Sequence, residues 1–205
     1  MRLMSVLSAA ALAAAVFVLP SDADAQRRGQ GASVVVLNVQ RVIAESALGR
    51  DMAARLDQVR QQVLQEAQAL QPEGQSIEQE LQRLRESTRN MSAEQIRNSS
   101  TYGPQFESVQ QRLAQFQQRG QVLQGDFECS QIFALRDLER QLSPVVRSVM
   151  ESRGAGVVLS SASVQYASPD QDITQAVIQQ LDQTARTATV ARHSVSECQA
   201  QQQQQ

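Results

Sequence analysis

The sequence predicts an α+β protein in which a long antiparallel α-helical coiled-coil hairpin is inserted into a small β-rich oligomerisation body. Three observations predict this fold. Apolar residues recur at seven-residue intervals, turn-forming residues divide that repeat near its middle, and short β-branched runs flank it at both ends. Aromatic residues make up only 3% of the 205 residues and Trp is absent, so a large compact core is not expected.

Residues 1–25 have the features of a secretory signal peptide. Arg2 gives a short positive start, and an alanine-rich apolar run follows from Met4 to Leu19. This run is shorter than the ~20 residues that span a bilayer. Ala23–Ala25 then matches the small-x-small pattern of signal peptidase cleavage. We therefore expect cleavage after Ala25 and a mature protein in the periplasm.

Residues 33–46 are expected to form the first part of the body. They open with Ser33–Val39, a short run rich in Val that is typical of a strand buried on both faces. From Ala47 the period changes to seven residues, in a row that comprises Leu56, Val63, Leu70, Ile77, Leu84 and Met91. A heptad sustained over about five repeats indicates the seam of a coiled coil.

Residues 47–149 are expected to form the hairpin, with its tip at about 88–104. Asn98–Pro104 holds turn residues that interrupt a helix. Beyond this turn, apolar residues mostly three and four apart run from Phe106 to Val149. Two seams of nearly equal length on either side of one turn suit an antiparallel hairpin, because each arm covers the apolar stripe of the other.

Three helix breakers lie inside the expected arms. Pro72 and Gly74 interrupt the first arm, where they predict a kink or a local break that would act as a hinge. Pro144 should bend or weaken the second arm near its end. The sequence therefore predicts arms with some flexibility.

Residues 150–183 are expected to complete the body. Arg153–Gly156 stops the second arm. Val157–Ser160 and Ser163–Tyr166 are then interpreted as a second and a third strand, and Asp172 is a good N-cap for a short helix.

Oligomerisation is expected because the body is small. Its predicted oligomerisation residues are Val34, Val35, Val36, Leu37, Val157, Val158 and Leu159. A unit of roughly 50 residues buries too little apolar surface to be stable alone, so subunits should associate. Residues 184–205, which end in a run of glutamines, are expected to be a disordered tail.

The sequence holds no constellation expected of an enzyme, a metal site or a cofactor site. The single histidine, His193, falls in the expected solvated tail, without a nucleophile or further ligands nearby. Removing residues 1–25 takes away one Arg and two Asp and leaves a net charge of −1, which argues against nucleic-acid binding. For Cys129 and Cys198, a mutual disulfide, separate thiols and intermolecular pairing all remain open.

Candidate client-binding residues are the apolar side chains outside the seam or near the tip, because the seam residues are covered by the opposite arm. They are Met91, Ile96, Tyr102, Phe106, Val122 and Phe133. Scattered apolar groups on a flexible arm would make many weak contacts, which suits promiscuous and releasable binding. The alternative is structural: the tip residues pack to end the hairpin, and Phe133 packs against the body.

Two segments carry a resemblance to a known family, namely VVVLNVQRVIAES at Val34–Ser46 and GVVLSSASVQYASPDQDIT at Gly156–Thr174. With the signal peptide and the hairpin between them, the chain resembles the Skp/OmpH family of periplasmic chaperones up to about Asp182. The resemblance implies a homotrimer with a shared β body and three hairpins that project around a cavity. It also implies an ATP-independent holdase for unfolded outer-membrane β-barrel precursors.

The near-neutral charge departs from this family, whose members are often strongly basic. Electrostatic capture of acidic clients and binding of lipopolysaccharide are therefore not supported for this chain. The alternative function is a structural coiled-coil spacer or adaptor in the cell envelope. An adaptor would recognise one folded partner, whereas a holdase would bind many unfolded chains.

Overall fold

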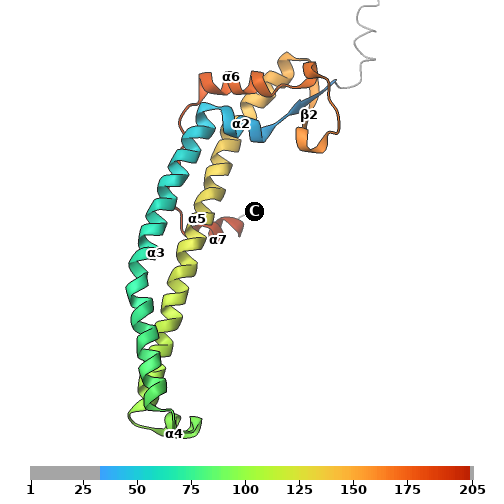
Figure 1. Cartoon of the computed structure of the whole chain (residues 1–205). Helices are drawn as coiled ribbons and strands as arrows, with labels where there is room; N and C mark the ends of the chain where they lie inside the picture. The colour runs from blue at the N-terminus through green and yellow to red at the C-terminus, as the bar shows by residue number, and fades with distance from the viewer. Residues whose placement is uncertain (1–32, 204–205) are drawn as a thin grey trace, which may run out of the picture.

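The computed structural model describes residues 33–203, and the expected signal peptide at residues 1–25 lies outside this range. The elements, in chain order, are β1 (Ser33–Leu37), α2 (Val39–Glu45), α3 (Ala47–Ser87), α4 (Ala93–Asn98), α5 (Tyr102–Ser152), β2 (Ala155–Ser160), the 3-10 turns η1 (Ser161–Ser163) and η2 (Pro169–Gln171), α6 (Thr174–Thr184) and α7 (Val195–Gln202). Figure 1 shows α3 and α5 side by side below a small body that holds α2, the strands and α6. The predicted pair of long helices is confirmed.

Two separate apolar clusters hold the hairpin. The basal cluster joins the body to the upper arms and consists of Val35, Leu37, Val42, Leu48, Met52, Ala134, Leu138, Leu142, Val145, Val149, Ala155, Ile173, Val177, Ile178 and Leu181. The distal cluster, near the tip, consists of Ile77, Leu84 and Val109, surrounded by the partly buried Leu81, Tyr102, Phe106, Leu113 and Phe116. Burial of these apolar side chains makes the main favourable contribution to the free energy that keeps the arms paired.

The first arm is continuous through Pro72, so of the two alternatives expected there the local break is wrong and the kink stays a prediction. Proline removes one backbone hydrogen bond from a helix, and contacts with the second arm flank this position. Glu73 forms an ion pair with Arg119. Gly74 leaves room for the ring of Phe116, whose Cζ would lie 2.9 Å from a Cβ added at that glycine. A hinge role for Pro72 and Gly74 stays a prediction.

The tip is more helical than predicted. After α3 ends at Ser87, the hydroxyl of Ser92 starts α4 through a reciprocal capping box with Gln95. The second arm, α5, already begins at Tyr102, so Pro104 lies inside its first turn. Proline is tolerated there because the first N–H groups of a helix have no partner within the helix.

The body contains two strands and not the three predicted. β1 and β2 run parallel, in a register that places Val34 beside Val157, and the hairpin is the crossover between them. The other edge of β1 is also used, because the backbone N–H of Ile173 donates to the carbonyl of Val36 at 3.0 Å. No strand forms over Ser163–Tyr166. The body is therefore largely helical, with α2 and α6 packed around a small sheet.

Local residues set the ends of the elements in the body. Asn38 ends β1 and starts α2, a helix that the sequence pattern did not predict, by accepting a hydrogen bond from the backbone N–H of Arg41 at 2.9 Å. The second arm continues through Pro144 and stops before Gly154, whose φ of 64° is readily adopted by glycine.

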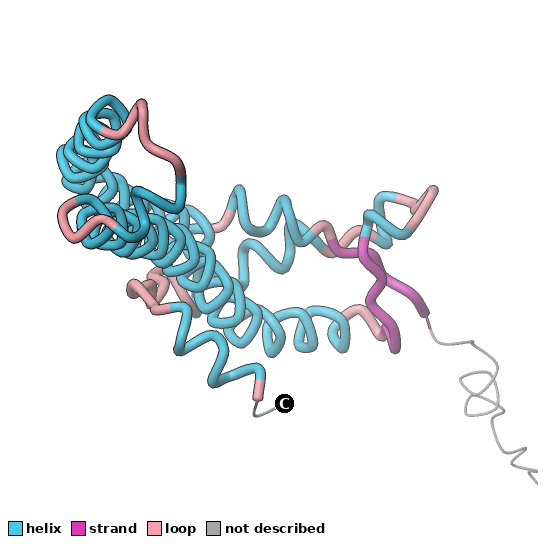
Figure 2. Tube along the Cα trace, turned by 90° about the horizontal axis from the view of Figure 1, so that it is seen from below, coloured by secondary structure: helices cyan, strands magenta, loops and turns pink. Residues whose placement is uncertain are grey.

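The prediction of a disordered tail is wrong for residues 185–203. They leave the body after α6, return along the hairpin and end in α7. In Figure 1, and in the perpendicular view of Figure 2, α7 lies against the side of the helix pair. The sequence composition of this segment is polar, and its placement depends on specific partners in the arms.

Candidate functional site

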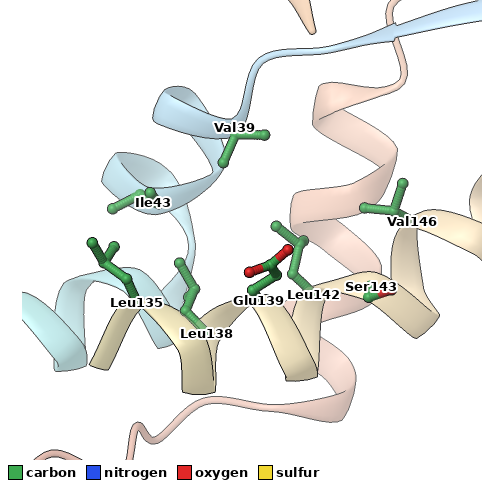
Figure 3. A pocket seen from close by; sticks show the side chains of 8 residues that line it. All are labelled: Val39, Ile43, Leu135, Leu138, Glu139, Leu142, Ser143 and Val146. Atoms are coloured by element: carbon green, nitrogen blue, oxygen red, sulfur yellow. The ribbon is translucent and has the colours of Figure 1, made fainter. Parts of the chain in front are cut away.

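An apolar groove lies where the hairpin meets the body, between α2 and α5. It has a volume of 410 Å³ and is lined by Val39, Ile43, Leu135, Leu138, Glu139, Leu142, Ser143 and Val146. Figure 3 shows Val39 and Ile43 on α2 facing the side chains of α5 across this basal groove. Val39 is 39% exposed and Leu135 is 48% exposed, so the groove presents apolar surface to solvent.

Sequence reasoning missed the basal groove. The available signal was the presence of apolar residues beside the seam of the second arm, such as Leu135 and Val146. Their partners Val39 and Ile43 lie on α2, which the sequence pattern had not identified as a helix. The groove is therefore a product of the tertiary structure.

A middle groove lies halfway along the hairpin, between the arms and the tail. It has a volume of 490 Å³ and is lined by Glu66, Ala69, Leu70, Gln118, Arg119, Val122, Leu123 and Arg192. Val122, one of the predicted client-binding residues, is 44% exposed here. The tail contributes Arg192, so the tail forms part of the wall of this groove.

Four predicted client-binding residues lie at the tip. Ile96 and Phe106 line a tip pocket of 370 Å³ between α4 and α5. Tyr102 and Phe106 pack against the distal cluster, in line with the structural alternative for these positions. Met91 is half-buried. The six candidates therefore form no single site, because Val122 lies far along α5 from this group.

The sixth candidate, Phe133, is covered by the tail and not by the body. Its ring stacks on the ring of His193, with centroids 3.8 Å apart and planes 11° apart. The backbone N–H of His193 donates to the hydroxyl of Ser130 at 2.9 Å. The expectation of a solvated tail histidine is therefore wrong.

A disulfide fixes the tail to the hairpin. Cys129 of α5 is bonded to Cys198 of α7, with their Cα atoms 5.9 Å apart. The sequence left this pairing open because it does not specify the distance between an arm and a polar tail. The bond holds α7 against the second arm.

The predicted oligomerisation residues divide into two groups. Val35–Leu37 of β1 are buried within the protomer, and Val34 is half-buried. In contrast, Val157 and Leu159 of β2 are exposed, while Val158 between them is partly buried against the basal cluster. Tyr166, nearby in the chain, is 86% exposed. Within the described residues, β2 pairs with β1 alone. An unpaired strand edge with exposed apolar side chains is suited to pairing with another chain.

Ion pairs between the arms add polar contacts to the apolar seam. Arg112 of α5 lies 2.5 Å from Glu80 of α3, and Arg119 pairs with Glu73. These groups are partly exposed, so each pair contributes only about 0–1 kcal/mol. They align the arms without adding net charge to the hairpin.

Two features are absent from the part of the chain that the structure describes, namely a cluster of metal-ligating side chains and a membrane-spanning helix. Over residues 33–203, no group of three or more His, Cys, Asp or Glu side chains is placed to hold a metal ion. In the same range, no helix combines the length and the apolar character needed to cross a bilayer.

The tail contact at Asp51 is expected to weaken in acid. The backbone N–H of Ala188 donates to the Asp51 carboxylate at 2.8 Å, and this bond, followed by the one from Arg55, holds the pKa of Asp51 below its usual value. A carboxyl group whose pKa is lowered by folding stabilises the fold at neutral pH, and this contribution is lost as the pH falls through the lowered pKa.

In an NMR titration, the Ala188 amide signal should therefore keep its neutral-pH position around pH ~3.9, where an ordinary Asp titrates, and move only at lower pH. The Asp51→Asn variant should show no such step. In the unsubstituted protein, a shift of the Ala188 signal at or above the pH where an ordinary Asp titrates would contradict the hydrogen bond between Ala188 and Asp51.

Comparison with known proteins identifies the family. A sequence profile described as outer membrane protein (OmpH-like) matches residues 33–181. No curated protein gives a significant match. The crystal structure of a candidate outer membrane chaperone (OmpH-like) from Caulobacter crescentus CB15 superposes with a TM-score of 0.60 at 24% identity, covering 80% of this chain and 92% of that chain, which shows a shared fold. Because the profile covers well over half of its length, the chain belongs to the OmpH-like family of outer membrane protein chaperones, which is not an enzyme family.

Proposed function

We propose that this chain is an ATP-independent periplasmic holdase that binds unfolded outer-membrane β-barrel precursors and prevents their aggregation. The observation that carries the proposal is the distribution of apolar surface. The basal groove, the middle groove and the tip pocket are separate and shallow, and they are spread along one hairpin. An unfolded chain can engage several weak sites at once, which gives useful overall affinity while each contact remains easy to release.

We further propose that the active form is a homotrimer joined through the bodies. The exposed Val157 and Leu159 on β2 and the exposed Tyr166 are apolar groups that association would bury. Pairing of the free edge of β2 with a neighbouring subunit would also satisfy its backbone groups. Three hairpins would then project from one shared body, with their grooves available to a client.

Light scattering of residues 26–205 tests both the proposed holdase activity and the proposed homotrimer. The protein alone should have the mass of a trimer. When a urea-denatured outer-membrane barrel is diluted into buffer with an equimolar amount of this trimer, client aggregation should be suppressed without nucleotide. A monomeric mass would overturn the shared body. A trimer that leaves the client to aggregate, yet binds one folded envelope protein, would favour the adaptor function instead.

The basal groove should contribute measurably to client capture. The double substitution Val39→Gln and Leu135→Gln removes two exposed apolar side chains, worth together on the order of 1–2 kcal/mol of contact. About tenfold more protein should then be needed to suppress aggregation of the same barrel.

A matched double variant, Ala54→Gln with Ala114→Gln, changes two exposed positions of the arms outside the grooves. It should capture the client as well as the unsubstituted protein does. Both double variants should keep the same circular dichroism spectrum and mass, since surface substitutions usually change stability by less than about 0.5 kcal/mol each. Equal capture by both variants would exclude the basal groove as a client surface.

A further inference from the structure

The hairpin has a weakly packed interval between its two apolar clusters. On α3 the interval runs from the basal residue Leu56 to the distal residue Ile77, and on α5 from Phe116 to Ala134. Among the described residues inside it, the buried apolar side chains are Val59, Leu123 and Cys129. This is the part of the hairpin where apolar burial contributes least to holding the arms together.

The tail crosses this interval and contacts both arms. Nearer the body, the Ala188 backbone N–H donates to Asp51 of α3. Further along, the guanidinium of Arg192 lies between the arms, donating to Glu66 of α3 at 2.5 Å and to Asp126 of α5 at 2.9 Å. One side chain of the tail therefore links the two helices directly, because its two terminal N–H groups donate to carboxylates on different arms.

The second arm carries polar groups that match the tail. Asp126 is only 7% exposed and Ser130 is fully buried, although both lie among apolar seam residues. Asp126 accepts hydrogen bonds from Arg192 and from the backbone N–H of Val195 at 3.1 Å. Ser130 accepts one from the backbone of His193. Buried polar groups require such partners, so the sequence of the arm is adapted to the docked tail.

The position of Gly125 supports the same conclusion. A Cβ added at Gly125 would collide with the side chain of Val195. The small residue therefore lets the tail approach the helix closely, directly beside Asp126. One turn further along α5, Cys129 is bonded to Cys198, which closes the contact covalently.

We propose that residues 185–203 are a disulfide-locked brace that ties the two arms together across the weak interval, and that a dithiol reductant releases it. In this thiol–disulfide exchange the two thiols of the reductant become a disulfide, while Cys129 and Cys198 each take up one electron and one proton. The freed tail then loses its covalent attachment to α5, and its remaining polar contacts with the arms can open.

Release of the brace would enlarge the client surface. Arg192 would leave the wall of the middle groove, and the half-buried Val63 and Leu70 of α3 would become more exposed as the arms separate. The oxidised protein would then hold smaller clients between stiff arms, and the reduced protein larger ones. This consequence rests on the proposed holdase function, whereas the brace itself does not.

Hydrogen exchange of the mature protein, without client, tests the brace. In the oxidised protein, amides at 59–70 and 116–130 should exchange slowly. Reduction with dithiothreitol, or the Cys198→Ser substitution, should speed their exchange about tenfold, while amides of α6 and of 77–88 stay unchanged. Arg192→Gln in the oxidised protein should give a smaller acceleration in the same two segments.

The matched control is Arg186→Gln, because Arg186 also lies in the tail but donates within the body, to the carbonyl of Asp182. It should leave exchange unchanged. Unchanged exchange at 59–70 and 116–130 on reduction would overturn the brace, and so would uniform acceleration over the whole chain. Aggregation assays with a small and a large denatured barrel, in oxidising and reducing buffer, then test the consequence. Failure to hold either barrel would count against the holdase function and leave the exchange result intact.

Discussion

Replacing Gly49 by alanine is expected to lower the free energy of unfolding by about 3 kcal/mol, at the upper end of the range for overpacking. Gly49 is buried in the first turn of α3, where that helix leaves α2. A Cβ at this position would overlap the backbone carbonyl of Ile43 and lie 2.7 Å from its carbonyl carbon. Because this neighbour is backbone within α2, it cannot rotate away, and α2 would have to shift within the basal cluster.

Gly120→Ala is the matched control. Gly120 lies in the second arm, and a Cβ there would meet nothing within 4 Å. Since alanine is the better helix former, this variant should gain roughly 0.5–1 kcal/mol. Urea denaturation followed by circular dichroism should therefore shift the midpoint in opposite directions for the two variants. A Gly49→Ala midpoint at or above that of the unsubstituted protein would show that α2 does not pack closely on α3.

The hairpin could be predicted because side chains buried at regular intervals along a helix appear in the sequence as apolar residues with the same spacing. Ile77, Leu84 and Val109 are buried where the seam predicted apolar contacts, and the turn between the arms falls where turn residues interrupt the repeat. The break at Pro72 was wrong for a physical reason. A proline weakens a helix locally, but packing of the neighbouring turns against the second arm outweighs one missing hydrogen bond.

The tail could not be predicted from composition. Its residues are polar, and nothing in their spacing shows a partner. The signal lies instead in the second arm, where Asp126 and Ser130 interrupt apolar seam positions and Gly125 removes a side chain. Such interruptions are equally typical of solvated positions in a coiled coil, so only the tertiary structure shows that Arg192 and Val195 satisfy them.

The exposure of the candidate client-binding residues could be predicted only in part, for a similar reason. Val122 is exposed, as expected of an apolar residue outside the seam, and its role in client binding stays a prediction, whereas Phe133 is covered by His193. Exposure on an isolated helix can be read from periodicity, but coverage by a distant segment cannot. The basal groove was missed because it needs α2, a helix whose start depends on the cap at Asn38.

Leu181→Ala and Ile77→Ala are expected to destabilise opposite ends of the molecule. Leu181 of α6 is 0% exposed in the basal cluster, and Ile77 of α3 is 1% exposed in the distal cluster. Each truncation should lower the free energy of unfolding by roughly 2–5 kcal/mol, through lost apolar contact and the cavity left behind. Leu64→Ala, at a position 46% exposed, is the surface control and should change it by less than about 0.5 kcal/mol.

Because the two clusters share no residue, their responses should be local. Hydrogen exchange of Leu181→Ala should accelerate in β1, α2 and α6 while amides at 77–88 and 106–113 remain protected. Ile77→Ala should give the reverse pattern. Equal acceleration at both ends in either variant would mean that body and tip unfold as one unit. Local responses would instead mean that the interval crossed by the tail separates two units that open independently.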